Sequence, residues 1–138
     1  MSIEFFYEDT DFMLDQPETY AIWITRIVDG EGYSIEALNY VFCSDAYLHQ
    51  INMDYLRHDT YTDIITFDNS DEDRLIESDI FISIDRVKEN SVTQNISFID
   101  ELARVLVHGV LHLMGWNDKT PEQKKQMREK EDASLSLR

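Results

Sequence analysis

A chain of 138 residues, 43% hydrophobic and 12% aromatic, has the length and composition of one globular domain with its own hydrophobic core, not of a disordered segment. Its single cysteine, Cys43, excludes an intrachain disulfide framework, and no stretch approaches the roughly 20 apolar residues of a transmembrane helix. The formal net charge of −16 repels other polyanions and therefore counts against nucleic-acid binding.

The two ends of the sequence add to these expectations. The N-terminus turns acidic at Glu4 and lacks the basic start and long apolar run of a secretory signal, so we expect a cytoplasmic protein with no membrane partner. The last 21 positions hold six of the twelve Lys and Arg residues. This cluster favours a solvated helix with charges of both signs, and an RNA strand would meet the least repulsion there.

Four elements are predicted in the first half of the chain. A short strand begins at Ile3. A helix begins at Pro17, because apolar residues then recur at helical spacing until Gly30. Alternating apolar side chains predict a strand over residues 34–43, and Ser44 is the expected N-cap of a helix that extends to about residue 55.

Five elements are predicted in the second half, two strands followed by three helices: residues 63–68, 79–85, 86–92, 98–114 and 121–135. Asp85 and Ser97 are the expected N-caps of the first two of these helices, and Gly115 ends the second. Strands and helices do not strictly alternate. The pattern therefore predicts an α+β fold with α/β-type layering, in which helices cover a small mixed four-stranded sheet and residues 1–138 form one domain.

The segment from His108 to Asp118 indicates a metal site. His108 and His112 are four residues apart, so on a helix they share one face, and both imidazoles can bind one zinc ion. Gly115 permits a left-handed exit from the helix, and a short turn can then bring Asp118 back to the ion. Three protein ligands leave a fourth position for water, as in catalytic zinc sites. The alternative is two histidines that are merely hydrogen-bonded on a half-buried helix.

The residue after the first histidine bears on the reaction. Zincin proteases carry a glutamate there as general base, whereas this chain has Gly109, which disfavours amide hydrolysis. A zinc ion lowers the pKa of bound water towards ~7 and stabilises negative charge on a substrate oxygen, so phosphodiester hydrolysis remains open. Nickel or another divalent ion also suits two histidines and a carboxylate.

Three further stretches accompany the histidine segment: Ile51-Asn52 through Tyr55, Thr62-Asp63-Ile64-Ile65-Thr66-Phe67, and Asp79-Ile80. Together with residues 108–118 they resemble the YbeY family of single-strand-specific endoribonucleases, which act in ribosomal RNA maturation and ribosome quality control. The resemblance covers residues from about 40 to about 118 with recognisable motifs. It implies a zinc site on a central helix and its exit turn, an α/β fold with a small mixed sheet, and cleavage of RNA near the ribosome.

The sequence departs from the family pattern at two functional positions. The third metal ligand is usually histidine in the family, whereas Asp118 stands here, and its negative charge is expected to make the metal a weaker Lewis acid. The family's functional arginine aligns with Leu56, and Arg57 comes one place later. The expected site is therefore His108, His112 and Asp118 as metal ligands, with Arg57, His108 and His112 as catalytic residues and no substrate-binding residue assigned.

The resulting prediction is a zinc-dependent, single-strand-specific endoribonuclease with one zinc ion per chain, acting in ribosomal RNA 3′-end maturation and ribosome quality control. Its expected partners are single-stranded or ribosomal RNA and the small ribosomal subunit, and no DNA. One alternative is a zincin-like metallohydrolase or protease, which a glutamate near the metal-bound water would favour. The other is a non-catalytic ribosome-assembly factor whose fold zinc stabilises.

Overall fold

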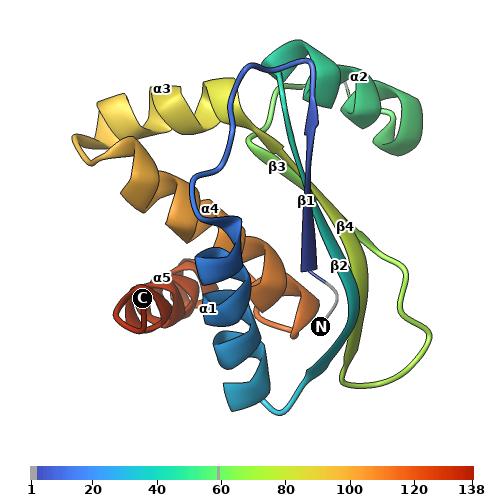
Figure 1. Cartoon of the computed structure of the whole chain (residues 1–138), viewed down its shortest axis with the longest axis vertical. Coiled ribbons are helices and arrows are strands. Elements are labelled where there is room, and N and C mark those ends of the chain that lie inside the picture. Colours follow the sequence, from blue (N-terminus) through green and yellow to red (C-terminus); the bar gives the residue numbers. More distant parts are fainter. Residues whose placement is uncertain (1–2, 59) are drawn as a thin grey trace.

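The computed structural model describes residues 3–58 and 60–138 (Figure 1). Within these residues it contains four strands and five helices, in the order β1 (Ile3–Glu8), α1 (Pro17–Gly30), β2 (Ser34–Cys43), α2 (Asp45–Leu56), β3 (Ile64–Asp68), β4 (Leu75–Ser83), α3 (Ile84–Gln94), α4 (Phe98–Leu113) and α5 (Pro121–Leu135). The strands form one sheet in the order β1-β2-β4-β3, in which β1, β2 and β4 are parallel and β3 runs antiparallel to β4. The predicted α+β fold with a mixed four-stranded sheet is confirmed. Among the described helices, none is both long and apolar enough to cross a membrane.

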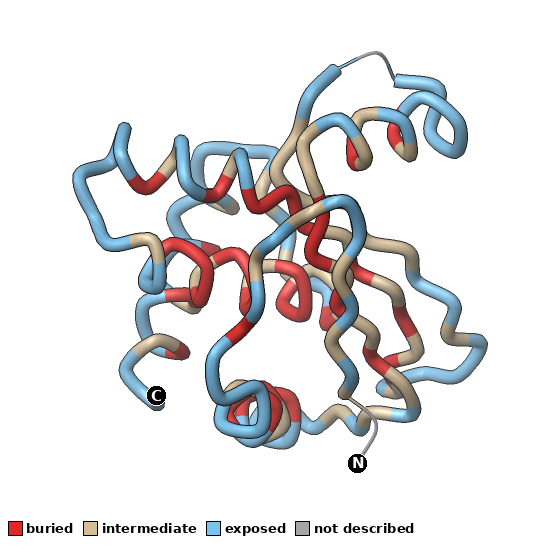
Figure 2. The backbone as a smooth tube through the Cα atoms, turned by 45° about the horizontal axis from the view of Figure 1, so that its top comes forward, coloured by how far each residue is buried: buried red, intermediate tan, exposed pale blue. Residues whose placement is uncertain are grey.

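Both faces of the sheet are apolar, and the helices divide between them. Leu38, Tyr40 and Ile80 on one face join the larger core cluster with α1 and α4. Cys43 and Ile65 on the other face pack against α2 in a smaller cluster. In Figure 1, α1, α4 and α5 accordingly lie on one side of the sheet and α2 on the other. Figure 2 shows the buried positions gathered where the helices meet the sheet.

Strand β4 and helix α3 differ in their boundaries from those expected from the sequence. Strand β4 begins at Leu75, not at residue 79, because Leu75 pairs with Ser34 of the parallel strand β2 and so extends the ladder. Helix α3 begins one residue before Asp85, because the hydroxyl of Ser83 accepts the amide of Arg86 at 3.1 Å and caps the helix. The expected caps Ser44 and Ser97 are confirmed.

Close packing brings α4 against the edge of the sheet. A β-carbon at Gly109 would lie 2.9 Å from Cδ1 of Ile80 and 3.1 Å from Cδ1 of Ile64, so glycine permits this approach. The buried hydroxyl of Tyr40 donates a 2.9 Å hydrogen bond to the carbonyl of Leu106 and ties β2 to the same helix. The half of α4 that carries both histidines is thereby held next to strand β3.

Candidate metal centre

Helix α4 ends in a turn that reverses the chain. Gly115 adopts a left-handed φ of 94°, the amide of Trp116 bonds to the carbonyl of Leu111 at 3.0 Å, and the amide of Gly115 bonds to the carbonyl of His112 at 3.0 Å. This pair of hydrogen bonds is a Schellman motif, which needs a residue that tolerates positive φ. The expected left-handed exit at Gly115 is confirmed, and it directs the following residues back towards the helix.

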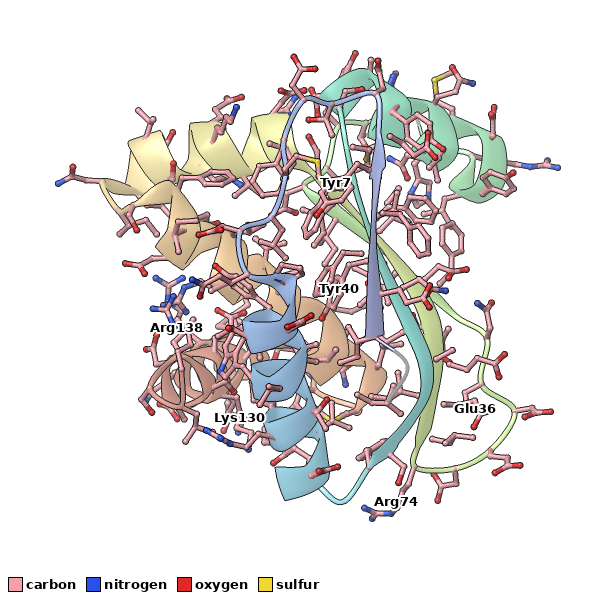
Figure 3. All side chains as sticks on the ribbon, in the orientation of Figure 1. Tyr7, Glu36, Tyr40, Arg74, Lys130 and Arg138 are labelled. Atoms are coloured by element: carbon pink, nitrogen blue, oxygen red, sulfur yellow. The ribbon has the colours of Figure 1, made fainter. Side chains whose placement is uncertain are left out.

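Contacts on both sides hold this turn. Trp116 Nε1 donates to Oε1 of Glu31 at 2.9 Å, and Lys130 Nζ donates to Oε2 of the same carboxylate at 2.9 Å. The Lys130 ammonium also lies 4.8 Å from the Trp116 ring centroid, and Figure 3 shows this side chain reaching from α5 towards α1. Beyond the turn, Thr120 and Gln123 form a capping box that starts α5. Asp118 is therefore held between two anchored segments.

The three candidate ligands converge. Oδ2 of Asp118 lies 3.4 Å from Nε2 of His108 and 3.4 Å from Nε2 of His112. Tetrahedral zinc with ligands at 2.0–2.1 Å has edges of about 3.3–3.4 Å between its ligand atoms. An N–H···O hydrogen bond is usually shorter, at 2.7–3.2 Å. The spacing thus suits a cation shared by the three side chains better than direct hydrogen bonds between them.

One side of this cluster faces solvent. The exposed fractions of the side chains are 22% for His108, 33% for His112 and 36% for Asp118. The two imidazole rings stand nearly perpendicular, at 81° with centroids 4.6 Å apart, as expected for two ligands that approach one ion from different directions. Two nitrogens and one oxygen are a donor set found in catalytic zinc sites, which also keep one position open. The residues therefore fit the expected metal.

The far side of His108 is buried against α5. Its Nδ1 lies 2.7 Å from Oε2 of Glu131, and Oε1 of that carboxylate accepts a 2.9 Å hydrogen bond from Arg104. Burial alone would lower the pKa of His108, but the hydrogen bond and charge of Glu131, together with Asp118 and Asp63, raise it above the ordinary value. Surroundings that favour a positively charged imidazolium also favour a bound cation.

A cavity of about 160 Å³ adjoins His108 on this side, and its lining includes Asp63, Glu101 and Arg128. Burial raises the pKa of both Asp63 and Glu101. Among the described residues, the buried Oε1 of Glu101 has no hydrogen-bond partner. The site is therefore backed by a polar interior and not by the apolar core.

The structure brings together His108, His112 and Asp118 but not the fourth predicted site residue. Arg57 is exposed at the C-terminal end of α2, with a left-handed φ of 57°, and contributes no atom to the cluster. Sequence analysis did not single out Glu131, which contacts His108 across 23 positions of the chain. The helical spacing could have indicated it, because Glu131 follows Met127 by four residues and so lies on the same inward face of α5.

Comparisons with known proteins identify the family of this chain. The family model described as Endoribonuclease YbeY matches residues 6–137. An Endoribonuclease YbeY of Cytophaga hutchinsonii is 58% identical over 137 residues, which cover 99% of this chain and 96% of the relative. That of Christiangramia forsetii is 45% identical and covers 96% of this chain and 92% of the relative. The solution structure of TM1509 from Thermotoga maritima matches with a TM-score of 0.69 at 25% identity, over 96% of this chain and 87% of that one. The chain belongs to the endoribonuclease YbeY family.

Proposed function

We propose that this protein is a zinc-dependent endoribonuclease that cuts single-stranded RNA during 3′-end maturation of ribosomal RNA and in ribosome quality control. One observation carries the metal-dependent part: the ring nitrogens of His108 and His112 lie at zinc-like spacing from one oxygen of Asp118. Family membership supports RNA hydrolysis. We place the protein in the cytoplasm, acting as one domain on RNA of the small ribosomal subunit.

The three side chains would hold one zinc ion on the solvent-facing side of α4. When bound, zinc polarises a phosphate oxygen and lowers the pKa of water, which is the chemistry that phosphodiester hydrolysis needs. His108 and His112 therefore act as ligands at the reacting centre. Arg57 is the proposed catalytic arginine, because a guanidinium stabilises the negative charge that develops on a phosphate.

The charge distribution favours one side for RNA approach. The chain as a whole is strongly acidic, with a net charge of −16. Lys124, Lys125 and Arg128 are exposed on α5, and Arg128 also lines the cavity beside His108. RNA held by such contacts binds more weakly as salt rises, so the KM for RNA should increase with ionic strength. Lys124→Glu and Lys125→Glu should also raise KM and leave the zinc content unchanged.

The protease alternative has less support. Gly109 occupies the position of the zincin glutamate. Glu131 contacts Nδ1 of His108, whereas Nε2 is the nitrogen that faces Asp118. This carboxylate therefore lies behind the ligand and not beside the open side of the cluster, where a general base would act.

The decisive experiment measures zinc content and cleavage of a single-stranded RNA oligonucleotide in the same preparations. Wild type should contain one zinc per chain, cut the single strand and spare a duplex of the same sequence. His112→Ala should lose both properties, whereas His49→Ala, on α2 outside the cluster, should keep both. A clean wild type that binds zinc but cuts no RNA would favour the assembly-factor alternative.

A complementation experiment in cells distinguishes the endoribonuclease from the assembly factor by a second route. If catalysis is the function, folded His112→Ala and Arg57→Ala variants should fail to correct the ribosomal RNA processing defect of a strain that lacks the gene. Arg57→Ala should keep its zinc and lose turnover, because Arg57 contributes no ligand. Equal rescue by the wild type and both variants would favour the non-catalytic assembly factor.

A further inference from the structure

The buried face of α5 delivers a carboxylate to the first histidine of the cluster. Oε2 of Glu131 lies 2.7 Å from Nδ1 of His108, and the opposite ring nitrogen, Nε2, faces Asp118 at 3.4 Å. An ionised carboxylate only accepts hydrogen bonds, so the proton of a neutral His108 ring must sit on Nδ1. The lone pair of the ring is then on Nε2, the atom that points into the cluster.

We propose that Glu131 is a positioning residue of the metal centre: it orients the His108 ring and selects the tautomer that leaves Nε2 free to bind a cation. The inference rests on the proposed function, because it presupposes that the cluster binds metal. Carboxylates behind metal-bound histidines act in this way generally, by fixing the ring and increasing the basicity of the ligand nitrogen.

Glu131 is itself held firmly. The side chain is 6% exposed, and each of its oxygens has its own partner, since Oε1 accepts from Arg104 at 2.9 Å while Oε2 contacts His108. Arg104 reaches Asp132 with its other terminal nitrogen at 2.7 Å. The arginine thus compensates the buried negative charge and prevents the carboxylate from rotating away from the ring.

Only His108 of the two histidines has a described carboxylate behind its Nδ1. Across residues 3–58 and 60–138, His112 contacts a carboxylate through Nε2, that of Asp118, and no described carboxylate contacts its Nδ1. His112 is also more exposed than His108, at 33% against 22%. Metal affinity should therefore depend on the contact between α4 and α5, although α5 contributes no ligand.

Glu131→Gln tests the proposal, with Asp132→Asn as the matched control. The glutamine amide can donate to Nδ1 and so favour the tautomer with its proton on Nε2, which blocks the metal-binding atom. Asp132 also contacts Arg104 but is 59% exposed and does not touch His108. Zinc affinity, measured by competition with a chromophoric chelator, should fall about 10–100-fold in Glu131→Gln and change less than about twofold in Asp132→Asn. The absorption spectrum of bound Co²⁺ should change in Glu131→Gln alone.

The imidazole ¹⁵N spectrum of metal-free wild type gives a second measurement that needs no variant to fold. In neutral His108 the proton should reside on Nδ1, and a proton on Nε2 would overturn the proposal. Equal zinc affinities for wild type and folded Glu131→Gln would also overturn it. A wild type that binds neither zinc nor Co²⁺ would instead refute the proposed function, so the two failures are distinguishable.

Discussion

Oδ2 of Asp118 lies 3.4 Å from Nε2 of His112, although the helix that carries the histidine ends before the aspartate is reached. The Schellman turn at Gly115 produces this proximity by reversing the chain. The contact from Trp116 to Glu31 then keeps the reversed segment in place. A helix and its exit thus place a carboxylate beside two imidazoles, which makes Asp118 the candidate ligand to test first.

Asp118→Ala should weaken zinc binding by at least about 100-fold, since loss of a ligand exceeds the 10–100-fold effect of an outer-shell change. Asp118→His should retain zinc within about tenfold of wild type, because imidazole nitrogen is an equally suitable donor. Competition with a chelator measures both, with Asn117→Ala as the control on the same turn. Wild-type affinity in Asp118→Ala would show that the aspartate does not bind the ion.

Gly109→Ala should lower the free energy of unfolding by about 1–3 kcal/mol. The added β-carbon would lie 2.9 Å from Cδ1 of Ile80, and this overlap should outweigh the gain in helix propensity of up to about 1 kcal/mol. Urea denaturation measures the loss. Ile80→Val removes the methyl group that would clash. It should therefore lower the free energy of unfolding by less in the Gly109→Ala variant than in the wild type. Additive effects of the two substitutions would contradict the proposed clash.

Stability should depend on pH through Glu101. Burial raises its pKa above the ordinary 4.5, so the folded state holds this proton more tightly than the unfolded state does. Protonated Glu101 therefore stabilises the folded state at low pH. This contribution to the free energy of unfolding is lost as pH rises from the pKa of the unfolded state through the higher pKa of the folded state. Glu101→Gln stays neutral, so it should exceed wild type in stability at pH 7 and approach it under acidic conditions.

Denaturation series at several pH values measure the Glu101 effect, with Glu129→Gln as the control. Glu129 is exposed on α5, so its substitution should change stability by less than about 0.5 kcal/mol at any pH. A stability difference between Glu101→Gln and wild type that does not vary with pH would rule out a buried, titrating carboxyl group.

Cys43 should be inert in the folded protein. Burial, together with the negative charges of Asp85 and Asp45, raises the pKa of its thiol to about 12, and the side chain is fully buried. The thiolate is the reactive form, so both access and ionisation are suppressed. Reaction with Ellman's reagent at neutral pH should be at least about 100-fold slower in native than in denatured protein. Comparable rates in the two states would contradict the packing of α2 on the sheet.

Local features of the site were predictable from the sequence. Spacing along one helix placed His108 and His112 on a common face, and Gly115 ended that helix because few other residues adopt the required positive φ. The caps at Ser44 and Ser97 were predictable for the same reason, since a cap joins residues only three apart.

Other features depended on distant segments. The early start of β4 at Leu75 required pairing with Ser34, which lies in another strand. The position of Arg57, exposed at the end of α2, could not be read from its alignment beside Leu56, because adjacent side chains point in different directions.

By itself, the sequence determined the α+β fold class, the helix that carries the two histidines and the exit that returns Asp118, because helical periodicity and capping act within a few residues. Only the tertiary structure decided the strand order and the contact of Glu131 with His108. The physical reason is that these depend on which surfaces pack together, and α5 reaches α4 only when both bury their apolar faces against one core.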